Sequence, residues 1–131
     1  MSELAAVRLL IVDDSDLLRD TLAELLRREG WEIETASHGA DGLAKVYTTR
    51  DAYHVVLLDL NMPIMDGWEV LASIRKDPNL SSVRVVILSA YLTEQADLNH
   101  AIERGADACL RKGFSDIPEI VRTIRSLVTT A

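Results

Sequence analysis

The sequence predicts an α/β fold in which helices cover both faces of a doubly wound parallel sheet. Five short aliphatic runs recur along the 131 residues, and the segments between them have room for a helix and two connections. The third and fourth runs are continuously apolar, which is typical of strands buried on both faces. A chain of this length forms one ordinary core, so we expect a single domain over residues 1–131.

The predicted strands are rich in β-branched or aliphatic residues. They are Val7–Val12, Trp31–Ala36, His54–Leu58, Val83–Leu88 and Asp107–Leu110, and their first residues lie 24, 23, 29 and 24 positions apart. Parallel strands cannot be joined by a tight turn, so each interval is expected to hold a helix. The two continuously apolar strands are expected at the centre of the sheet.

Two of the intervening segments have a clear helical pattern. The first has possible caps at Asp14 and Ser15 and ends at Gly30, and its apolar stripe is Leu18, Leu22, Leu25 and Leu26. The last tolerates Pro118 in its first turn, and its stripe is Ile117, Ile120, Val121, Ile124, Leu127 and Val128.

The helix predicted from Thr93 to Arg104 has a weaker pattern. The residues that it offers for burial are only Leu92, Ala96, Ala101 and Ile102. Because little apolar surface anchors it, we expect this helix to be one that is able to move.

Composition excludes several classes of protein. The chain has 14 Lys and Arg against 21 Asp and Glu, and the formal charge of −7 argues against direct nucleic-acid binding and against an anionic membrane surface. A single cysteine, Cys109, excludes an intramolecular disulfide. The early apolar run Leu9–Val12 is too short for a signal peptide or a membrane span. We therefore expect a cytoplasmic domain.

Polar residues follow four of the predicted strands: Asp13 and Asp14 the first, Asp59 the third, Ser89 the fourth and Lys112 the fifth. Ligands of a doubly wound sheet bind outside the carboxyl ends of the strands, so these side chains should converge on one crevice. Taken one at a time, these residues also have structural explanations. Asp13 and Asp14 fit a helix cap, Ser89 fits a turn, and Lys112 fits a solvated surface charge. Asp59 is harder to explain structurally, because a carboxylate ending a buried strand needs a positive partner.

Three carboxylates in one crevice repel each other and require neutralisation. A hard divalent cation with oxygen ligands supplies it and keeps positions free for a phosphate, so Mg²⁺ is the expected cofactor. Zinc is disfavoured, because His38, His54 and His100 are scattered and Cys109 has no partner at ligand spacing.

Facing a cation and Lys112, an ionised Asp59 can attack a phosphorus centre and form an aspartyl phosphate. The hydroxyl of Ser89 can then donate a charge-assisted hydrogen bond to the new phosphoryl group. That bond is absent before modification, which provides a physical basis for a switch.

Four stretches follow the order and spacing of a known family. They are Leu-Leu-Ile-Val-Asp-Asp-Ser, Val-Val-Leu-Leu-Asp-Leu-Asn-Met-Pro-Ile-Met-Asp-Gly, Val-Ile-Leu-Ser-Ala and Gly-Ala-Asp-Ala-Cys-Leu-Arg-Lys. Over essentially its whole length the chain resembles the receiver domain of bacterial two-component response regulators. The resemblance implies a flavodoxin-like fold of five βα units with strand order 2-1-3-4-5.

The resemblance also implies roles for individual residues. Asp59 is similar to the phosphoacceptor, Asp13 and Asp14 to the acidic pair that holds Mg²⁺, and Asn61 to the residue whose backbone carbonyl completes the metal site. Ser89 is similar to the hydroxyl residue that follows the phosphoryl group.

The resemblance also implies roles for residues in the loops beside the site. Lys112 resembles the phosphate-binding lysine, while Pro63 and Gly67 match the shaped loop after the phosphorylation site. The implied donor is a sensor histidine kinase or a phosphotransfer protein. Trp68 follows that loop and is expected to pack at a helix edge rather than in a ligand pocket.

The chain departs from the family at two positions. Cys109 stands where an aromatic residue commonly reports phosphorylation, and we expect it to be a small buried apolar residue. Output would then pass through the loop and helix after Ser89, with Tyr91 as one participant. Gly113 replaces the usual proline after Lys112, which leaves two alternatives: a trans loop that repositions the lysine, or a rare cis peptide.

The leading functional hypothesis is a phosphorylation-dependent switch that transfers a phosphoryl group to Asp59, hydrolyses it slowly and changes its affinity for a downstream protein. No dedicated enzyme is expected beyond that self-modification. One alternative is a pseudo-receiver scaffold. Another is a Mg²⁺-dependent phosphatase of the haloacid dehalogenase kind, which needs a carboxylate two residues after the nucleophile, where this chain has Asn61.

Overall fold

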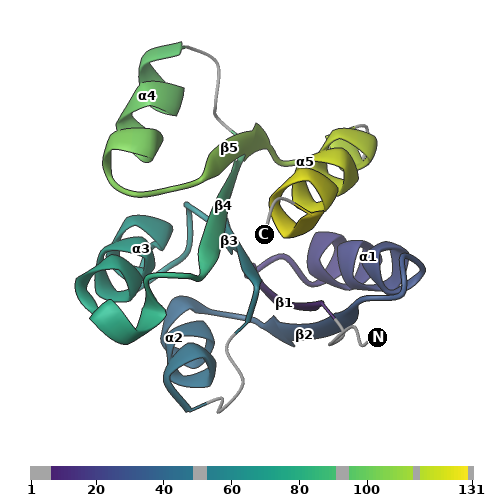
Figure 1. Cartoon of the computed structure of the whole chain (residues 1–131), viewed down its shortest axis with the longest axis horizontal. Coiled ribbons are helices and arrows are strands. Elements are labelled where there is room, and N and C mark those ends of the chain that lie inside the picture. The colour runs from purple at the N-terminus through teal and green to yellow at the C-terminus, as the bar shows by residue number, and fades with distance from the viewer. Residues whose placement is uncertain (1–6, 49–52, 91–94, 114–115, 130–131) are drawn as a thin grey trace.

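The computed structural model describes residues 7–48, 53–90, 95–113 and 116–129. Strands and helices alternate along the chain (Figure 1). The strands are β1 (Arg8–Val12), β2 (Glu32–Ala36), β3 (Val55–Asp59), β4 (Arg84–Ser89) and β5 (Ala108–Arg111). The helices are α1 (Asp16–Arg27), α2 (Gly39–Thr48), α3 (Gly67–Lys76), α4 (Gln95–Glu103) and α5 (Ile117–Thr129), with one 3₁₀ turn, η1 (Pro78–Leu80), before β4.

The strands form one parallel sheet in the order β2-β1-β3-β4-β5, which confirms the predicted doubly wound topology. β3 lies at the centre, and all five of its residues are buried. β4 is next to it and is buried from its second residue onward. The apolar runs of these two strands are explained by helices on both faces.

Each face of the sheet has its own layer of helices (Figure 1). On one face, α1 and α5 pack over side chains such as Leu9, Ile11 and Leu57. On the other, α2 and α3 pack over Leu10, Val56 and Leu58, and α4 adds to the same cluster. Side chains that alternate along each strand therefore serve two cores, and the carboxyl edge of the sheet is left for polar residues.

Three predicted strands begin and end one residue too early. Asp59 and Ser89 are the last residues of β3 and β4 rather than the residues that follow them. The ladder continues past the apolar run, since Asp59 pairs with Leu88 and Ser89 with Arg111. The first two predicted strands only begin one residue early. Two site residues are thereby fixed in the sheet itself.

The helices differ from prediction at two points. Ser15 is the N-cap of α1 by position, but its side chain makes no capping hydrogen bond, and its amide instead donates to Asp13 Oδ1 at 2.8 Å. In α4, Ala101 is fully buried, yet Ile102, which we expected to be buried, is 50% exposed. Leu98 packs partly against the core instead.

The structure does not test the other predictions for α4, which concern its start and two further residues expected to be buried. Thr93 and Leu92 lie outside the described residues, as does the side chain of Ala96. Among the described residues, none of the helices combines the length and apolar composition that a membrane span requires.

Candidate functional site

Adjacent parallel strands bring Asp13 and Asp59 together. Val12 at the end of β1 pairs with Leu58 in β3, so Asp13 and Asp59 follow on neighbouring strands at the same edge of the sheet. Both carboxylates are 1% exposed, whereas Asp14 is exposed. One carboxylate oxygen from each of Asp13, Asp14 and Asp59 lies within 4.8 Å of the other two. The structure therefore gathers all three predicted carboxylates.

Lys112 reaches the same cluster from the loop after β5. Its Nζ lies 3.0 Å from Asp13 Oδ1 and 2.9 Å from Asp59 Oδ2, and its amide donates to the carbonyl of Ser89 at 3.1 Å. The described residues contain no cis peptide bond, so the Lys112–Gly113 bond is trans. Of the two alternatives for Gly113, the trans loop is the one found, and it leaves the ammonium group in contact with two carboxylates.

Burial and neighbouring charges change the proton affinity of two groups in the cluster. Burial raises the pKa of the Asp59 carboxyl from 3.8 to about 6, with Lys112 opposing this shift and Asp13 adding to it. Burial acts to lower the pKa of Lys112, but its hydrogen bonds to Asp59 and Asp13 outweigh burial and place that pKa above 10.5. At neutral pH Asp59 is therefore mostly ionised and paired with a charged lysine.

The cluster fits a hard cation. Asp13 Oδ2 is buried and has no hydrogen-bond partner in the described part of the chain. A buried carboxylate oxygen without a partner is costly unless a cation or an ordered water satisfies it. Three carboxylates at one point supply the oxygen ligands that a divalent ion such as Mg²⁺ takes.

The histidines lie elsewhere. His54 Nδ1 accepts from the Arg8 amide at 3.0 Å, and His38 Nδ1 accepts from the Asp41 amide at 3.1 Å. The ring of His100 meets that of Trp68. Each histidine therefore has its own separate contacts, and among the described residues the one group of three or more possible metal-ligating side chains is Asp13, Asp14 and Asp59.

Ser89 and Asn61 lie beside the cluster. Ser89 is 3% exposed at the end of β4, the strand next to that of Asp59. Asn61 is exposed, and its amide donates to Asp59 Oδ1 at 3.3 Å. The two oxygens of the Asp59 carboxylate are therefore contacted by different groups, Lys112 on one and the Asn61 amide on the other.

The loop from β3 to α3 is shaped by close backbone contacts. The amide of Gly67 donates to the Leu60 carbonyl at 2.9 Å, and a Cβ on Gly67 would lie 2.4 Å from the carbonyl oxygen of Asp59. Only glycine fits this approach. Ile64 on the same loop has φ 69° and is fully exposed, a feature that the sequence pattern did not predict.

Trp68 packs at the edge of α3, as expected. It contacts the core cluster, its ring centroid lies 5.1 Å from that of His100 on α4, and the Arg104 guanidinium lies 5.2 Å from the same ring. Cys109 is 7% exposed within that core, in agreement with a small buried residue. Tyr91, which we linked to output, lies outside the described residues.

The fold and the site define a class of protein: a doubly wound α/β domain that collects carboxylates and one lysine at the carboxyl edge of its sheet. Comparison with known proteins gives the family. The model described as "Response regulator receiver domain" matches residues 9–125, and the chain belongs to this family. It is a receiver domain of response regulators, a class that interacts with histidine kinases or phosphotransfer proteins.

Curated relatives share the sequence over most of this chain. It is 40% identical over 121 residues to the transcriptional regulatory protein CpxR homolog of Haemophilus influenzae, covering 92% of this chain and 50% of the relative. It is 34% identical over 122 residues to the response regulator PleD of Caulobacter vibrioides, covering 93% of this chain and 26% of the relative. The chain thus spans half or less of the length of these relatives.

Solved structures share the fold. The Vibrio cholerae chemotaxis protein CheY4 matches with a TM-score of 0.83 and 28% identity, covering 94% of this chain and 99% of that one. The Thermotoga maritima response regulator TrrA, solved in complex with Mg²⁺-BeF, matches with a TM-score of 0.78 and 34% identity, covering 92% and 97%.

Proposed function

We propose that this domain accepts a phosphoryl group on Asp59 from a sensor histidine kinase or a phosphotransfer protein and thereby changes its affinity for a downstream protein. The observation that carries the proposal is the environment of Asp59. Its buried carboxylate belongs to a three-carboxylate cluster and is paired with Lys112 at 2.9 Å.

The proposed reaction uses the chain's own groups. An oxygen of the ionised Asp59 attacks the phosphorus of a phosphohistidine, the P–N bond breaks, and the imidazole nitrogen leaves with the bonding electron pair and takes up a proton. With a pKa of about 6, the carboxyl is ionised in roughly nine molecules of ten at pH 7. Lys112 offsets the charge of the phosphoryl oxygens, and Ser89 donates to one of them.

Asp13, Asp14, Asp59 and the backbone carbonyl of Asn61 are the proposed ligands of Mg²⁺. The unpartnered Asp13 Oδ2 supports this assignment. When bound, the ion offsets negative charge on the carboxylates and on the transferred group. Without it, Lys112 is the cation that contacts both buried carboxylates.

The proposed output is a change in protein binding through α4, β5 and α5 rather than contact of this domain with DNA. The formal charge of −7 supports this, because a DNA-binding face needs clustered positive charge. The small apolar anchor of α4, with Ala101 buried and Ile102 exposed, supports a helix that shifts. The proposed setting is the cytoplasm, where the kinase domains that supply the phosphoryl group work.

Intact-mass measurement with a small acyl phosphate tests the proposal. We expect wild type with Mg²⁺ to gain one phosphoryl group, and expect no gain with EDTA or in Asp59→Asn. Glu24→Gln, which removes an exposed carboxyl on α1, is the matched control and should behave as wild type. Absence of an adduct on wild type would indicate a scaffold. Rapid turnover of phosphate esters would indicate a phosphatase.

A further inference from the structure

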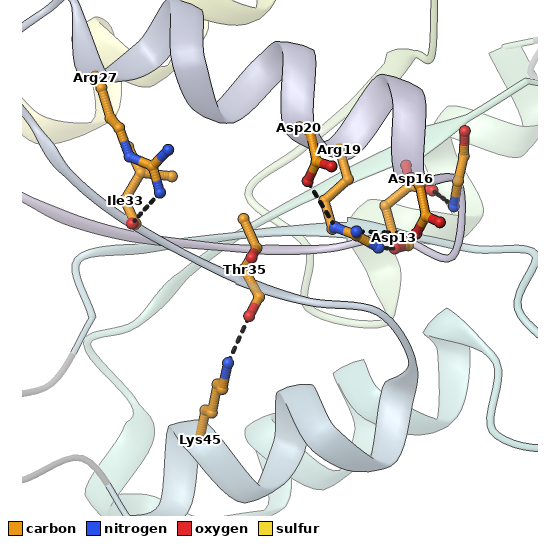
Figure 2. A network of polar contacts seen from close by, with 9 residues as sticks. Asp13, Asp16, Arg19, Asp20, Arg27, Ile33, Thr35 and Lys45 are labelled. Carbon is orange, nitrogen blue, oxygen red and sulfur yellow. Dashed lines mark hydrogen bonds and ion pairs between the residues drawn. The ribbon is translucent and has the colours of Figure 1, made fainter.

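Arg19 on α1 ties the start of that helix to the end of β1 (Figure 2). Its Nη1 donates to the carbonyl oxygen of Asp13 at 3.2 Å, its Nη2 lies 2.9 Å from Asp16 Oδ1, and its Nε lies 3.2 Å from Asp20 Oδ1. The arginine side chain is 12% exposed, whereas those of Asp16 and Asp20 are 82% and 68% exposed. Exposed ion pairs contribute little, so the bond to the Asp13 carbonyl is the contact of interest.

The surroundings of Asp13 leave one polar atom for a ligand. Its amide donates to the Ala36 carbonyl at 3.1 Å, and its carbonyl accepts from Arg19. Its Oδ1 accepts from the Ser15 amide at 2.8 Å and from Lys112 Nζ at 3.0 Å. Its Oδ2 is buried and has no hydrogen-bond partner among the residues that the structure describes. The backbone of Asp13 is thus held from both sides while one carboxylate oxygen remains available.

The guanidinium suits this position because of its shape. Three nitrogens of one planar group contact three different residues, and an ammonium group has no comparable fork. One side chain thereby pairs with the exposed Asp16 and Asp20 and still reaches the backbone at the strand end.

We propose that Arg19 is a positioning residue for the metal site, which by holding the Asp13 carbonyl sets where Asp13 Oδ2 meets a divalent cation. This inference rests on the proposed Mg²⁺ site. The change in Mg²⁺ affinity that this role predicts for a variant lacking Arg19 is opposite in sign to the change expected from loss of its charge alone. A positive charge beside the cluster repels a cation, so its removal alone would tighten Mg²⁺ binding. Loss of a group that orients a ligand weakens metal binding, by about 10-fold or more.

Arg27 provides a matched control. It lies at the other end of the same helix, and its Nη2 donates to the Ile33 carbonyl at 3.1 Å (Figure 2). Arg19→Met and Arg27→Met therefore remove the same charge and the same kind of hydrogen bond from one helix, but only Arg19 contacts Asp13. Arg19→Lys retains the charge but lacks the planar fork that reaches three partners.

The experiment measures Mg²⁺ dissociation constants by isothermal titration calorimetry on the full chain. We expect Arg19→Met to weaken Mg²⁺ binding by about 10-fold, Arg19→Lys to fall between it and wild type, and Arg27→Met to match wild type. In acyl-phosphate reactions, Arg19→Met should raise the half-saturating Mg²⁺ concentration by a similar factor and leave the plateau rate within about twofold. A general loss of structure would lower the plateau instead. Urea unfolding in EDTA checks that each variant is folded.

Unchanged or tighter Mg²⁺ binding in Arg19→Met, with normal binding and phosphorylation of wild type, would overturn the positioning role and leave the proposed function intact. Equal weakening in Arg27→Met would overturn it too, because the effect would then belong to the helix. If Arg19→Met does not fold, Arg19→Lys decides: wild-type affinity refutes the role of the fork. Wild type that binds no Mg²⁺ would overturn both proposals.

Discussion

Neutralising Asp59 should stabilise the fold, and by an amount that grows with pH. The pKa of this carboxyl is about 6 in the folded protein against 3.8 ordinarily, so the folded state binds the proton more tightly than the unfolded state does. The carboxyl's contribution is most favourable below pH 3.8 and is lost as pH rises through 6. One pKa unit corresponds to 1.36 kcal/mol, so ionising Asp59 costs the fold about 3 kcal/mol at pH 7.

Urea unfolding of wild type and Asp59→Asn in EDTA measures this cost. The variant cannot ionise at position 59, so the difference in free energy of unfolding, variant minus wild type, should rise by about 2–3 kcal/mol between pH 4 and pH 7. The pairing of ionised Asp59 with Lys112 is already contained in the pKa of about 6, because that lysine stays charged throughout. A difference between the asparagine side chain and the protonated carboxyl adds a constant offset, so the slope carries the test.

Glu24→Gln is the control, because it removes a carboxyl whose side chain is 70% exposed. Its difference from wild type should stay flat over the same pH range. A flat or falling difference for Asp59→Asn would refute the reasoning, since it would mean that burial does not disfavour the ionised carboxylate.

Three further predictions concern the loop and the helix beside the site. Gly67→Ala should lower the free energy of unfolding in urea by about 1–3 kcal/mol, because its Cβ would lie 2.4 Å from the backbone of Asp59; unchanged stability would contradict that packing. Ile64→Gly should raise the free energy of unfolding by up to about 1 kcal/mol, because glycine adopts φ 69° without strain and the exposed Ile64 side chain contributes no packing. Ile64→Val should not raise it, and a lower free energy of unfolding in Ile64→Gly would contradict the strain. Hydrogen exchange between Ser89 and Arg104 should change when Mg²⁺ and beryllofluoride are added, and no change there would contradict output through α4.

Sequence patterns predicted the fold well because they report burial directly. The apolar runs of β3 and β4 occupy both faces of the sheet, so their composition alone marks them as central strands. The ends of those strands were missed by one residue because hydrogen bonding continues into Asp59 and Ser89, which are polar. Hydropathy detects the core, and the ladder extends beyond it.

The site was predicted as a set of residues but not as a set of contacts. Strand-end positions placed Asp13, Asp59 and Lys112 at one edge, and the structure brings them within hydrogen-bond distance. The sequence analysis did not identify Arg19, because a single arginine in a helical segment does not indicate which backbone carbonyl its side chain contacts. The available signal was its spacing, six residues after Asp13, which places it at the end of the first turn of α1.

Other features depend on three-dimensional contacts alone. Ile64 is the central residue of a three-residue turn in which the Met65 amide donates to the Pro63 carbonyl at 2.7 Å. Its positive φ belongs to that turn, and a β-branched residue is a poor indicator of the conformation. Ala101 is buried as predicted, but the exposure of its neighbour Ile102 depends on how α4 is rotated against the core. With so short an apolar pattern, periodicity could not determine that rotation.

The central claim is that Asp59 accepts a phosphoryl group in a metal-dependent reaction, and chemical trapping tests it most directly. Borohydride reduces an aspartyl phosphate to homoserine, which peptide mass spectrometry locates to one position. After reaction with a small acyl phosphate and Mg²⁺, we predict homoserine at position 59 and none when EDTA replaces Mg²⁺. Homoserine at position 13 or 14, or equal conversion at position 59 without a metal, would contradict the account.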